Sequence, residues 1–361
     1  PDFLRRLASW QAALQAAGLS ITAAQAEELA GRFRLTPEQI REAVFLVSRQ
    51  QPTKKSPKLP PDKTPDLSRD IPARLGAAIR RQTADVFGPL AKKIAPCATW
   101  PDIILPEDTR QQLQELCQRL RYGQQVMEAW GFETKLSRGR GVNALFTGPP
   151  GVGKTMATEI LANELGLDLY RIDLAGIVSK YIGETEKNLE TIFTRAKDAN
   201  LILLFDEADA LFGKRSEVRD SHDRYANLEI SYLLQKMEEY EGISILATNM
   251  RHNLDEAFAR RLQFSIHFPF PDEDSRRQIW QIIWPPQAPV DNTLDLAWLA
   301  QKFKLSGGNI KNIALAAAFL AAAQGRPISM EHILQAVRRE YQKLGKPVAE
   351  SDLRYPTRED T

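Results

Sequence analysis

The chain has 361 residues, of which 43% are hydrophobic and 26% charged, a composition typical of a soluble globular protein with room for two or three domains. Its formal net charge of +2 gives no reason to expect binding to nucleic acid or to an anionic membrane. The two cysteines, Cys97 and Cys117, indicate no disulfide framework and favour a reduced, cytoplasmic location. The longest apolar run, Ile313–Ala323, falls short of the roughly 20 residues that a membrane span needs, so we expect a buried helix there.

An internal repeat opens the chain, because residues 1–40 match residues 271–310 without a gap. Chance similarity between two amphipathic helical stretches is the alternative. The coincidence of aromatic, basic and apolar positions favours duplication of one small helical unit. The matched pairs include Arg6 and Arg276, Trp10 and Trp280, Leu29 and Leu299, Phe33 and Phe303, Leu35 and Leu305, and Ile40 and Ile310.

The pattern then changes several times along the chain. Residues 51–66 form a Pro/Lys-rich linker without apolar periodicity. Helical spacing returns at Arg69–Ile94, and Thr109–Trp130 is an amphipathic helix. From Val142 to Phe268 apolar strands alternate with helices, which predicts a parallel sheet covered on both faces, and after Pro271 the pattern is all helical.

A phosphate-binding loop is predicted between an expected strand at Val142–Phe146 and an expected helix at Met156–Leu165. Its glycines allow backbone N–H groups to surround a phosphate chain, and the helix directs its positive end at the same anion. Lys154 supplies a charge for the outer phosphates, and the Thr155 hydroxyl is a candidate Mg²⁺ ligand. A Gly/Pro turn before an ordinary helix is the alternative. The candidate nucleotide-binding residues of this loop are Gly148, Pro149, Pro150, Gly151, Val152, Gly153, Lys154, Thr155 and Met156.

Two further strands end in polar residues. Leu201–Phe205 runs into Asp206 and Glu207, which are candidates for holding Mg²⁺ and for polarising the attacking water, respectively. A strand that simply ends in solvated acids is the alternative. Ile243–Thr248 ends at Asn249, which either orients the lytic water, contacts the terminal phosphate, or only closes the strand into a turn.

Arg260 and Arg261 close a short predicted helix. They are either two surface cations near a helix C-terminus or an arginine finger that reaches into the site of a neighbouring subunit.

Taken in order, these motifs resemble those of the AAA+ ATPases, and within them the AAA clade of valosin-containing protein, the proteasomal ATPases and FtsH. The resemblance extends from about Trp100 to Leu344. It implies an α/β fold, a P-loop NTPase with a three-layer αβα parallel sheet, followed by a small α-helical lid. It also implies ATP or ADP with Mg²⁺ as ligands, and a ring-shaped homo-oligomer, a hexamer, that acts on a protein substrate.

The resemblance assigns roles to single residues. Gly148–Thr155 corresponds to Walker A, Asp206 and Glu207 to Walker B, Asn249 to sensor 1, and Arg260 or Arg261 to the finger that acts in trans. Two further nucleotide contacts are implied, namely the adenine-side residues and the start of the sensor-2 helix, where the arginine of many AAA+ proteins is missing. These residues are Asp102, Ile103, Gly307 and Gly308.

The segment Lys180-Tyr181-Ile182-Gly183 lies between an expected strand at Leu169–Leu174 and an expected helix at Glu186–Ala196. By resemblance it is the substrate pore loop, in which Tyr181 grips a threaded polypeptide through sequence-tolerant apolar contact. Packing of Tyr181 under its own helix is the alternative. No H-E-x-x-H motif is present, so a fused metalloprotease is not expected.

The whole chain is similar to bacterial AAA+ ATPases encoded beside contractile injection systems. We therefore expect an ATP-driven protein remodeller. A nucleotide-dependent scaffold with slow hydrolysis is the alternative, and a nucleic-acid motor is disfavoured by the balanced charge. The expected divisions are 1–50, a lid-like remnant of an upstream module; 51–68, a linker; 69–98, a helical connector; 99–270, the large ATPase subdomain; 271–347, the lid; and 348–361, a tail.

Overall fold

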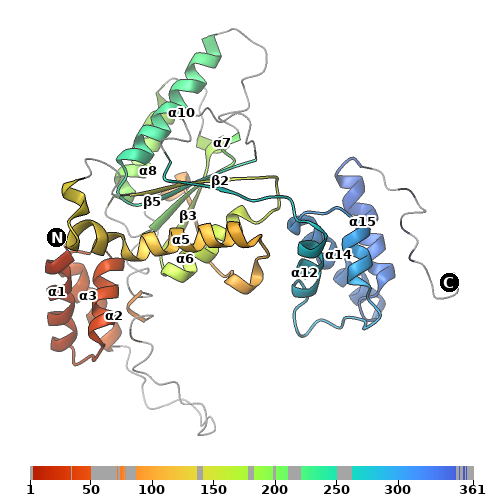
Figure 1. The fold of residues 1–361 in the computed structure, drawn as a ribbon, viewed down its shortest axis with the longest axis horizontal. Coiled ribbons are helices and arrows are strands. Elements are labelled where there is room, and N and C mark those ends of the chain that lie inside the picture. The colour runs from red at the N-terminus through yellow and green to blue at the C-terminus, as the bar shows by residue number, and fades with distance from the viewer. Residues whose placement is uncertain are drawn as a thin grey trace, which may run out of the picture.

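The computed structural model describes the backbone of residues 3–33, 35–49, 71, 74–76, 78, 87–135, 141–177, 183–197, 201–209, 221–249, 262–346, 349, 353 and 355, and their side chains except those of 32, 124, 133 and 221–228. Helices and strands combine into an α/β domain with a helical unit before it and another after it (Figure 1). None of the described helices is long and apolar enough to cross a membrane.

A six-stranded sheet forms the centre of the ATPase region, with strand order β1-β3-β4-β5-β2-β6. Strands β2 to β6 are parallel to one another, which confirms the expected α/β fold. The strands are β1 (Lys92–Ile94), β2 (Val142–Thr147), β3 (Asp168–Asp173), β4 (Leu201–Asp206), β5 (Ile243–Thr248) and β6 (Phe264–His267).

Strand β1 was not expected, since the sequence pattern predicted only helix between residues 69 and 98. It pairs antiparallel with β3 at the edge of the sheet. Lys93 Nζ lies 2.7 Å from the buried carboxylate of Asp168, which fixes the pair. Three residues are too few to show a two-residue alternation, so tertiary pairing rather than local pattern forms this strand.

Helices cover both faces of the sheet (Figure 1). On one face α5 (Glu107–Gln124) and α6 (Lys154–Leu165) pack with Ala144 and Phe146 of β2. On the other face α8 (Glu184–Ala196) and α10 (Ser221–Glu239) pack with Leu145 of the same strand. Alternate residues of one buried strand therefore serve two separate cores, as expected for a parallel sheet.

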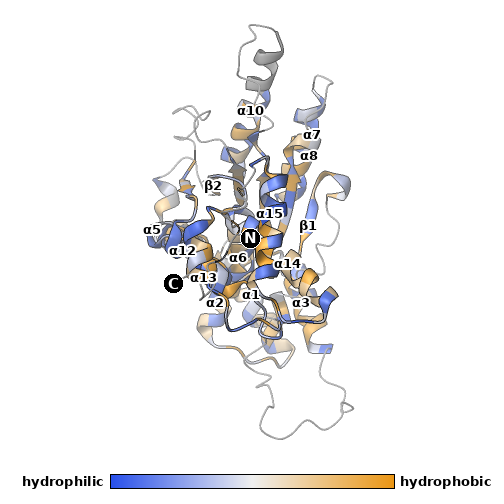
Figure 2. Ribbon diagram, turned by 90° about the vertical axis from the view of Figure 1, so that its right-hand side faces the viewer, coloured by the Kyte–Doolittle hydropathy of each residue, from blue (hydrophilic) through white to orange (hydrophobic). Residues whose placement is uncertain are grey.

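The lid follows the sheet as a separate helical core built around the fully buried Trp280. Its long helix is buried on one side only, because Leu315 and Phe319 are 57% and 69% exposed. The expectation of a fully buried helix at Ile313–Ala323 was therefore wrong for its outer side, and Figure 2 shows the hydrophobic colouring of α14. The lid helices are α12 (Glu273–Ile282), α13 (Leu296–Lys302), α14 (Gly307–Gln324) and α15 (Met330–Lys343).

The first helical unit repeats the construction of the lid. Its helices are α1 (Phe3–Ala16), α2 (Ala23–Arg32) and α3 (Pro37–Arg49). Arg6 Nε donates to the carbonyl of Ala30 at 3.1 Å, and in the lid Arg276 Nε donates to the carbonyl of Ala300 at 2.8 Å. Both arginines are buried, and Trp10 of α1 is as fully buried as Trp280 of α12. Such agreement in buried polar contacts supports duplication over chance similarity.

Residues beyond α3 also belong to this packing. Ile71, Leu75 and Ala78 are buried in the same core as the α3 residue Val47, and Arg74 Nη2 donates to the carbonyl of Val47 at 3.1 Å. In the lid, α15 packs in the corresponding way, since its Ile333, Ala336 and Val337 share one core with α14. The described residues between 71 and 78 thus complete the first unit in the way that α15 completes the lid.

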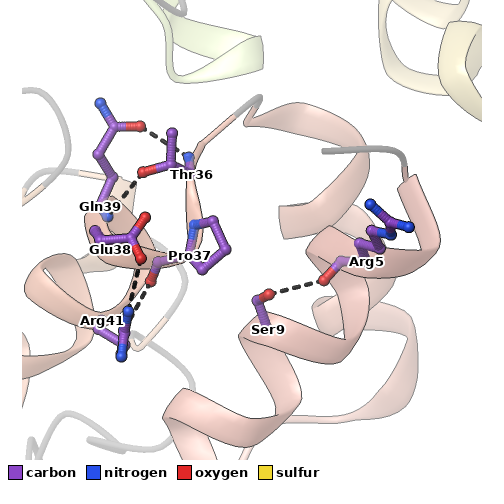
Figure 3. Close-up of polar contacts among 7 residues, drawn as sticks. All are labelled: Arg5, Ser9, Thr36, Pro37, Glu38, Gln39 and Arg41. Atoms are coloured by element: carbon purple, nitrogen blue, oxygen red, sulfur yellow. Dashed lines mark hydrogen bonds and ion pairs between the residues drawn. The ribbon is translucent and has the colours of Figure 1, made fainter.

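The two units differ at the start of their third helix. Thr36 and Gln39 form a reciprocal cap at the start of α3 (Figure 3), and Ser306 and Asn309 form the same cap at the start of α14. Between the cap residues, however, α3 carries Pro37 and Glu38 where α14 carries two glycines. Glu38 is exposed and pairs with Arg41 at 2.8 Å. This end of the first unit therefore faces solvent.

The first unit is fastened to the ATPase region beyond α5. A π-helix at Gln125–Ala129 follows α5 and carries Glu128. Glu128 accepts a hydrogen bond of 2.8 Å from the backbone N–H of Phe3 and lies 3.9 Å from Arg6 Nη2. Helix α2 packs beside α5, so the first unit and the ATPase region share one hydrophobic core.

Candidate nucleotide site

The loop before α6 has the backbone that a phosphate-binding loop requires. Gly153 has φ +104°, in the left-handed region that favours glycine, and caps the start of α6. A Cβ atom on Gly148 would lie 2.1 Å from the carbonyl oxygen of Phe268, so a side chain is excluded there too. Helix α6 begins at Lys154, and its free N–H groups and positive end face the loop.

Lys154 is buried and uses all three of its protons within the protein. Its Nζ donates to the carbonyls of Gly148 and Pro149 at 2.6 and 2.9 Å, and to Asn249 Oδ1 at 2.8 Å. Burial lowers the pKa of Lys154, while the charges of Asp206 and Asp209 oppose this shift. Phosphate oxygens are stronger hydrogen-bond acceptors for an ammonium group than carbonyl oxygens are. A bound phosphate can therefore draw Lys154 Nζ away from its carbonyl partners.

The acids at the end of β4 are held by a cation that sequence reasoning missed. Arg171, on the adjacent strand β3, places Nε 3.0 Å from Asp206 Oδ2 as an ion pair and Nη2 3.6 Å from Glu207 Oε1. Glu207 has φ +56°, the sole non-glycine residue with positive φ among the described residues. That conformation costs about 1–3 kcal/mol. The Glu207 side chain is 57% exposed.

Asn249 lies beside Lys154 at the end of β5, and a second missed residue holds it there. Asp209 accepts hydrogen bonds from Thr248 Oγ1 at 2.7 Å, from the backbone N–H of Asn249 at 2.7 Å and from its Nδ2 at 2.6 Å. Burial acts to raise the pKa of Asp209, but the bonds from Thr248 and Asn249 outweigh it and hold the pKa below its usual value. Asp209 is therefore ionised at neutral pH.

The lid touches the phosphate loop directly. The backbone N–H of Gly308, at the start of α14, donates to the carbonyl of Gly151 at 2.8 Å. A Cβ on Gly308 would lie 3.1 Å from the Gly151 Cα, so the two glycines allow a closer approach than other residues would. Gly307 adjoins the same carbonyl, which a Cβ there would meet at 3.4 Å.

The predicted adenine-side residues reach the loop unequally. Ile103 touches it, since a Cβ on Gly153 would lie 3.2 Å from Ile103 Cδ1. The Asp102 carboxylate instead accepts from the backbone N–H and hydroxyl of Thr99 at 2.7 and 2.6 Å. Those two bonds lower the pKa of Asp102 and engage its carboxylate in a local cap.

Several predicted site residues lie outside the described part of the chain. They include both finger candidates, Arg260 and Arg261, and three residues of the expected pore loop, Lys180, Tyr181 and Ile182. Gly183 is described and has φ +86° at the start of α8, where an L side chain would be strained. The roles of the other five residues stay predictions.

Two families match the chain. Residues 144–271 match the ATPase family associated with various cellular activities (AAA), and residues 2–85 match the contractile injection system ATPase helical domain. The second match spans the first helical unit together with residues up to 85.

Curated relatives agree with these matches. Cell division protein C of Sulfolobus acidocaldarius is 30% identical over 283 residues, which cover 73% of this chain and 71% of that protein. The proteasome-activating nucleotidase of Saccharolobus solfataricus is 27% identical over 286 residues, 75% of this chain and 72% of that protein. Katanin p60 ATPase-containing subunit A1 of Strongylocentrotus purpuratus is 32% identical over 206 residues, 52% of this chain.

The chain spans only 39% of that katanin subunit and 50% of the 26S proteasome subunit RPT4 of Saccharomyces cerevisiae, which it also matches. The phosphate loop, the acids of β4 and these similarities agree. The chain belongs to the AAA ATPase family. It is a nucleotide-binding ATPase that also carries the helical domain of contractile injection system ATPases.

Proposed function

We propose that the chain is the motor of a protein-remodelling ring, a homohexamer that serves a contractile injection system in the cytoplasm. The observation that carries this proposal is the combination within one chain of Lys154 bonded to Asn249, the acids of β4 and the helical domain matched at residues 2–85. The similarity to the proteasome-activating nucleotidase supports a protein rather than a nucleic acid or a membrane as the substrate.

The chemistry follows from the residues around the loop. Gly148–Thr155 binds the phosphates of ATP, and Lys154 leaves its carbonyl partners for the outer phosphate oxygens. Glu207 accepts a hydrogen bond from the attacking water and then its proton. Arg260 or Arg261 of a neighbouring protomer neutralises the charge that develops on the transferred phosphoryl group, which is why assembly and hydrolysis are coupled.

Magnesium fits this donor set. The Thr155 hydroxyl lies in the first turn of α6 and the Asp206 carboxylate ends β4, and both are the hard oxygen ligands that Mg²⁺ prefers. When bound, Mg²⁺ neutralises charge on the outer phosphates. Asp206 must then exchange its ion pair with Arg171 for the metal.

The substrate contact is proposed at the segment before α8. Lys180, Tyr181 and Ile182 would face the centre of the ring, with Gly183 allowing the turn into the helix. A ring of tyrosines offers apolar contact that tolerates many sequences, which suits pulling on an unfolded chain.

The Glu207→Gln variant tests this function. Without the base we expect ATP to remain bound and turnover to be lost, so that assembled rings hold their client. The variant is purified in ATP from the native host, and the proteins retained with it are identified. Retention of a sheath or baseplate protein supports the proposal, whereas unchanged ATP turnover contradicts the assignment of Glu207.

Tyr181→Ala is the companion to that test. It should leave ATP hydrolysis intact and abolish unfolding of the retained client, measured by loss of client fluorescence or by protease sensitivity. Equal unfolding by the wild type and Tyr181→Ala would contradict threading by this residue.

One observation favours a second function, an assembly scaffold with slow hydrolysis. Arg171 pairs with both acids and Lys154 donates to acceptors within the protein, so ATP and Mg²⁺ have to displace these contacts before hydrolysis. The two functions differ in turnover by the assembled oligomer. A rate that stays below about one ATP per minute after assembly favours the scaffold, because enzymes typically turn over at about 1–10³ s⁻¹.

A further inference from the structure

The amide of Asn249 can face the site in only one orientation. Its Nδ2 is 2.6 Å from Asp209 Oδ2, and its Oδ1 is 2.8 Å from Lys154 Nζ. A carboxylate only accepts hydrogen bonds and an ammonium only donates them. The NH₂ group must therefore point to Asp209, and the carbonyl oxygen must point to the phosphate loop.

Asp209 is placed to enforce this orientation at two points. It binds the side-chain amide of Asn249 and also the backbone N–H of the same residue, while Thr248 adds a third bond. The backbone of its own segment is registered against β5, because Ala208 N–H donates to the carbonyl of Ala247 at 3.1 Å. Rotating the Asn249 amide would set its carbonyl oxygen against a carboxylate and its NH₂ group against an ammonium.

We propose that Asp209 is a positioning residue that makes Asn249 a hydrogen-bond acceptor during ATP hydrolysis. When phosphate oxygens draw Lys154 away, the Asn249 carbonyl oxygen is released toward the space beside the terminal phosphate. The Asn249 oxygen then accepts a hydrogen bond from one O–H of the attacking water, while Glu207 accepts a hydrogen bond from the other. Asn249 therefore orients the water and does not donate to the terminal phosphate.

The step balances as an ordinary hydrolysis. The water oxygen forms a bond to the terminal phosphorus as the bond to the bridging oxygen breaks, and ADP leaves with that electron pair. The proton of the water passes to Glu207, and Asn249 takes no proton. This inference rests on the proposed catalytic roles of Glu207 and Asn249.

The first test is Asp209→Asn, which keeps the size of the side chain but replaces one acceptor by a donor. We expect kcat to fall about 10- to 100-fold, the effect of misplacing one orienting group. KM and the affinity for ADP should stay within about threefold of the wild type, because the ground state uses the phosphate loop. Asp291→Asn is the matched control, since Asp291 caps a turn in the lid through Thr293 and should leave kcat unchanged.

The second test is the exchange Asp209→Asn with Asn249→Asp. The amide at 209 then donates to the carboxylate at 249, and that carboxylate can still accept from water but cannot donate. We expect the exchange to recover kcat at least severalfold over Asp209→Asn alone. A folded exchange variant that binds ADP normally but is no faster than Asp209→Asn would overturn the acceptor role.

The outcomes also separate this inference from the proposed function. A kcat of Asp209→Asn within twofold of the wild type, together with loss of turnover in Glu207→Gln, would overturn the role of Asp209 alone. Undiminished turnover in both variants would show that hydrolysis takes place without this site. Thermal melting of each variant shows whether any loss comes from unfolding instead.

Discussion

Arg171 is the ion-pair partner of the two acids at the end of β4. Its guanidinium approaches both Asp206 and Glu207 from the adjacent strand. The positive φ of Glu207 puts that carboxylate within reach of the same cation. A cation that binds Asp206 therefore has to compete with the Arg171 guanidinium.

Arg171→Met should therefore lower the Mg²⁺ concentration that half-saturates ATP hydrolysis. The ion pair is partly exposed, so we expect an effect of about 1 kcal/mol or less, up to about fivefold. Titration of ATPase activity with Mg²⁺ at saturating ATP measures it, with the exposed Arg326→Met as the control. A higher requirement for Mg²⁺ in Arg171→Met would show that the arginine assists the metal instead of competing with it.

Residues of the site were predictable where a sequence motif identifies them. Lys154 starts a helix after a glycine loop, and Asp206 and Asn249 each end a buried strand. The roles of Arg171 and Asp209 were not predicted, because the residues that they contact come from a neighbouring strand. A charged residue in β3 and a third acid after β4 look like ordinary surface positions until the sheet brings them together.

The lid and the first unit differ in whether the start of their third helix contacts the phosphate loop. Gly308 lets the start of α14 approach Gly151, whereas the matching position in α3 is the exposed Glu38. The first unit keeps the buried Arg6 and Trp10 of its copy but not the end that meets a phosphate loop.

Gly308→Ala should weaken nucleotide binding, because its Cβ would lie 3.1 Å from the Gly151 Cα and push the lid from the loop. Overpacking of this kind costs roughly 1–3 kcal/mol, so we expect about a tenfold loss of ADP affinity. Calorimetric titration with ADP measures the effect. Glu38→Ala, at the matching position of the first unit, is the control; equal affinities for the two variants would contradict a direct link between lid and loop.

Helices and strands with a strong sequence pattern were predictable. The short strand β1 and the packing of a segment far along the chain were not. The strands β2, β4 and β5 and the helices α6 and α8 lie within two residues of their expected bounds. The three residues of β1 were missed because they gain strand structure only by pairing with β3. The packing of Ile71 and Leu75 on the first unit was also missed, since a linker separates them from α3 in the sequence.

The chain joins an α/β region that carries the phosphate loop to two helical units of common construction. The lid contacts the phosphate loop through Gly308, while the first unit is fixed to the π-helix after α5 through Glu128. We therefore expect the lid, rather than the first unit, to move when nucleotide binds.

The most direct test of hydrolysis at a site shared between protomers is the rate of phosphate release by wild type and Glu207→Gln, followed across protein concentration together with sedimentation. We predict that wild-type turnover per chain rises as rings form, because a neighbouring protomer completes the site. Glu207→Gln should form the same rings in ATP and release almost no phosphate. Turnover by wild-type monomers at the full rate, or undiminished release by Glu207→Gln, would contradict hydrolysis at a shared site beside Glu207.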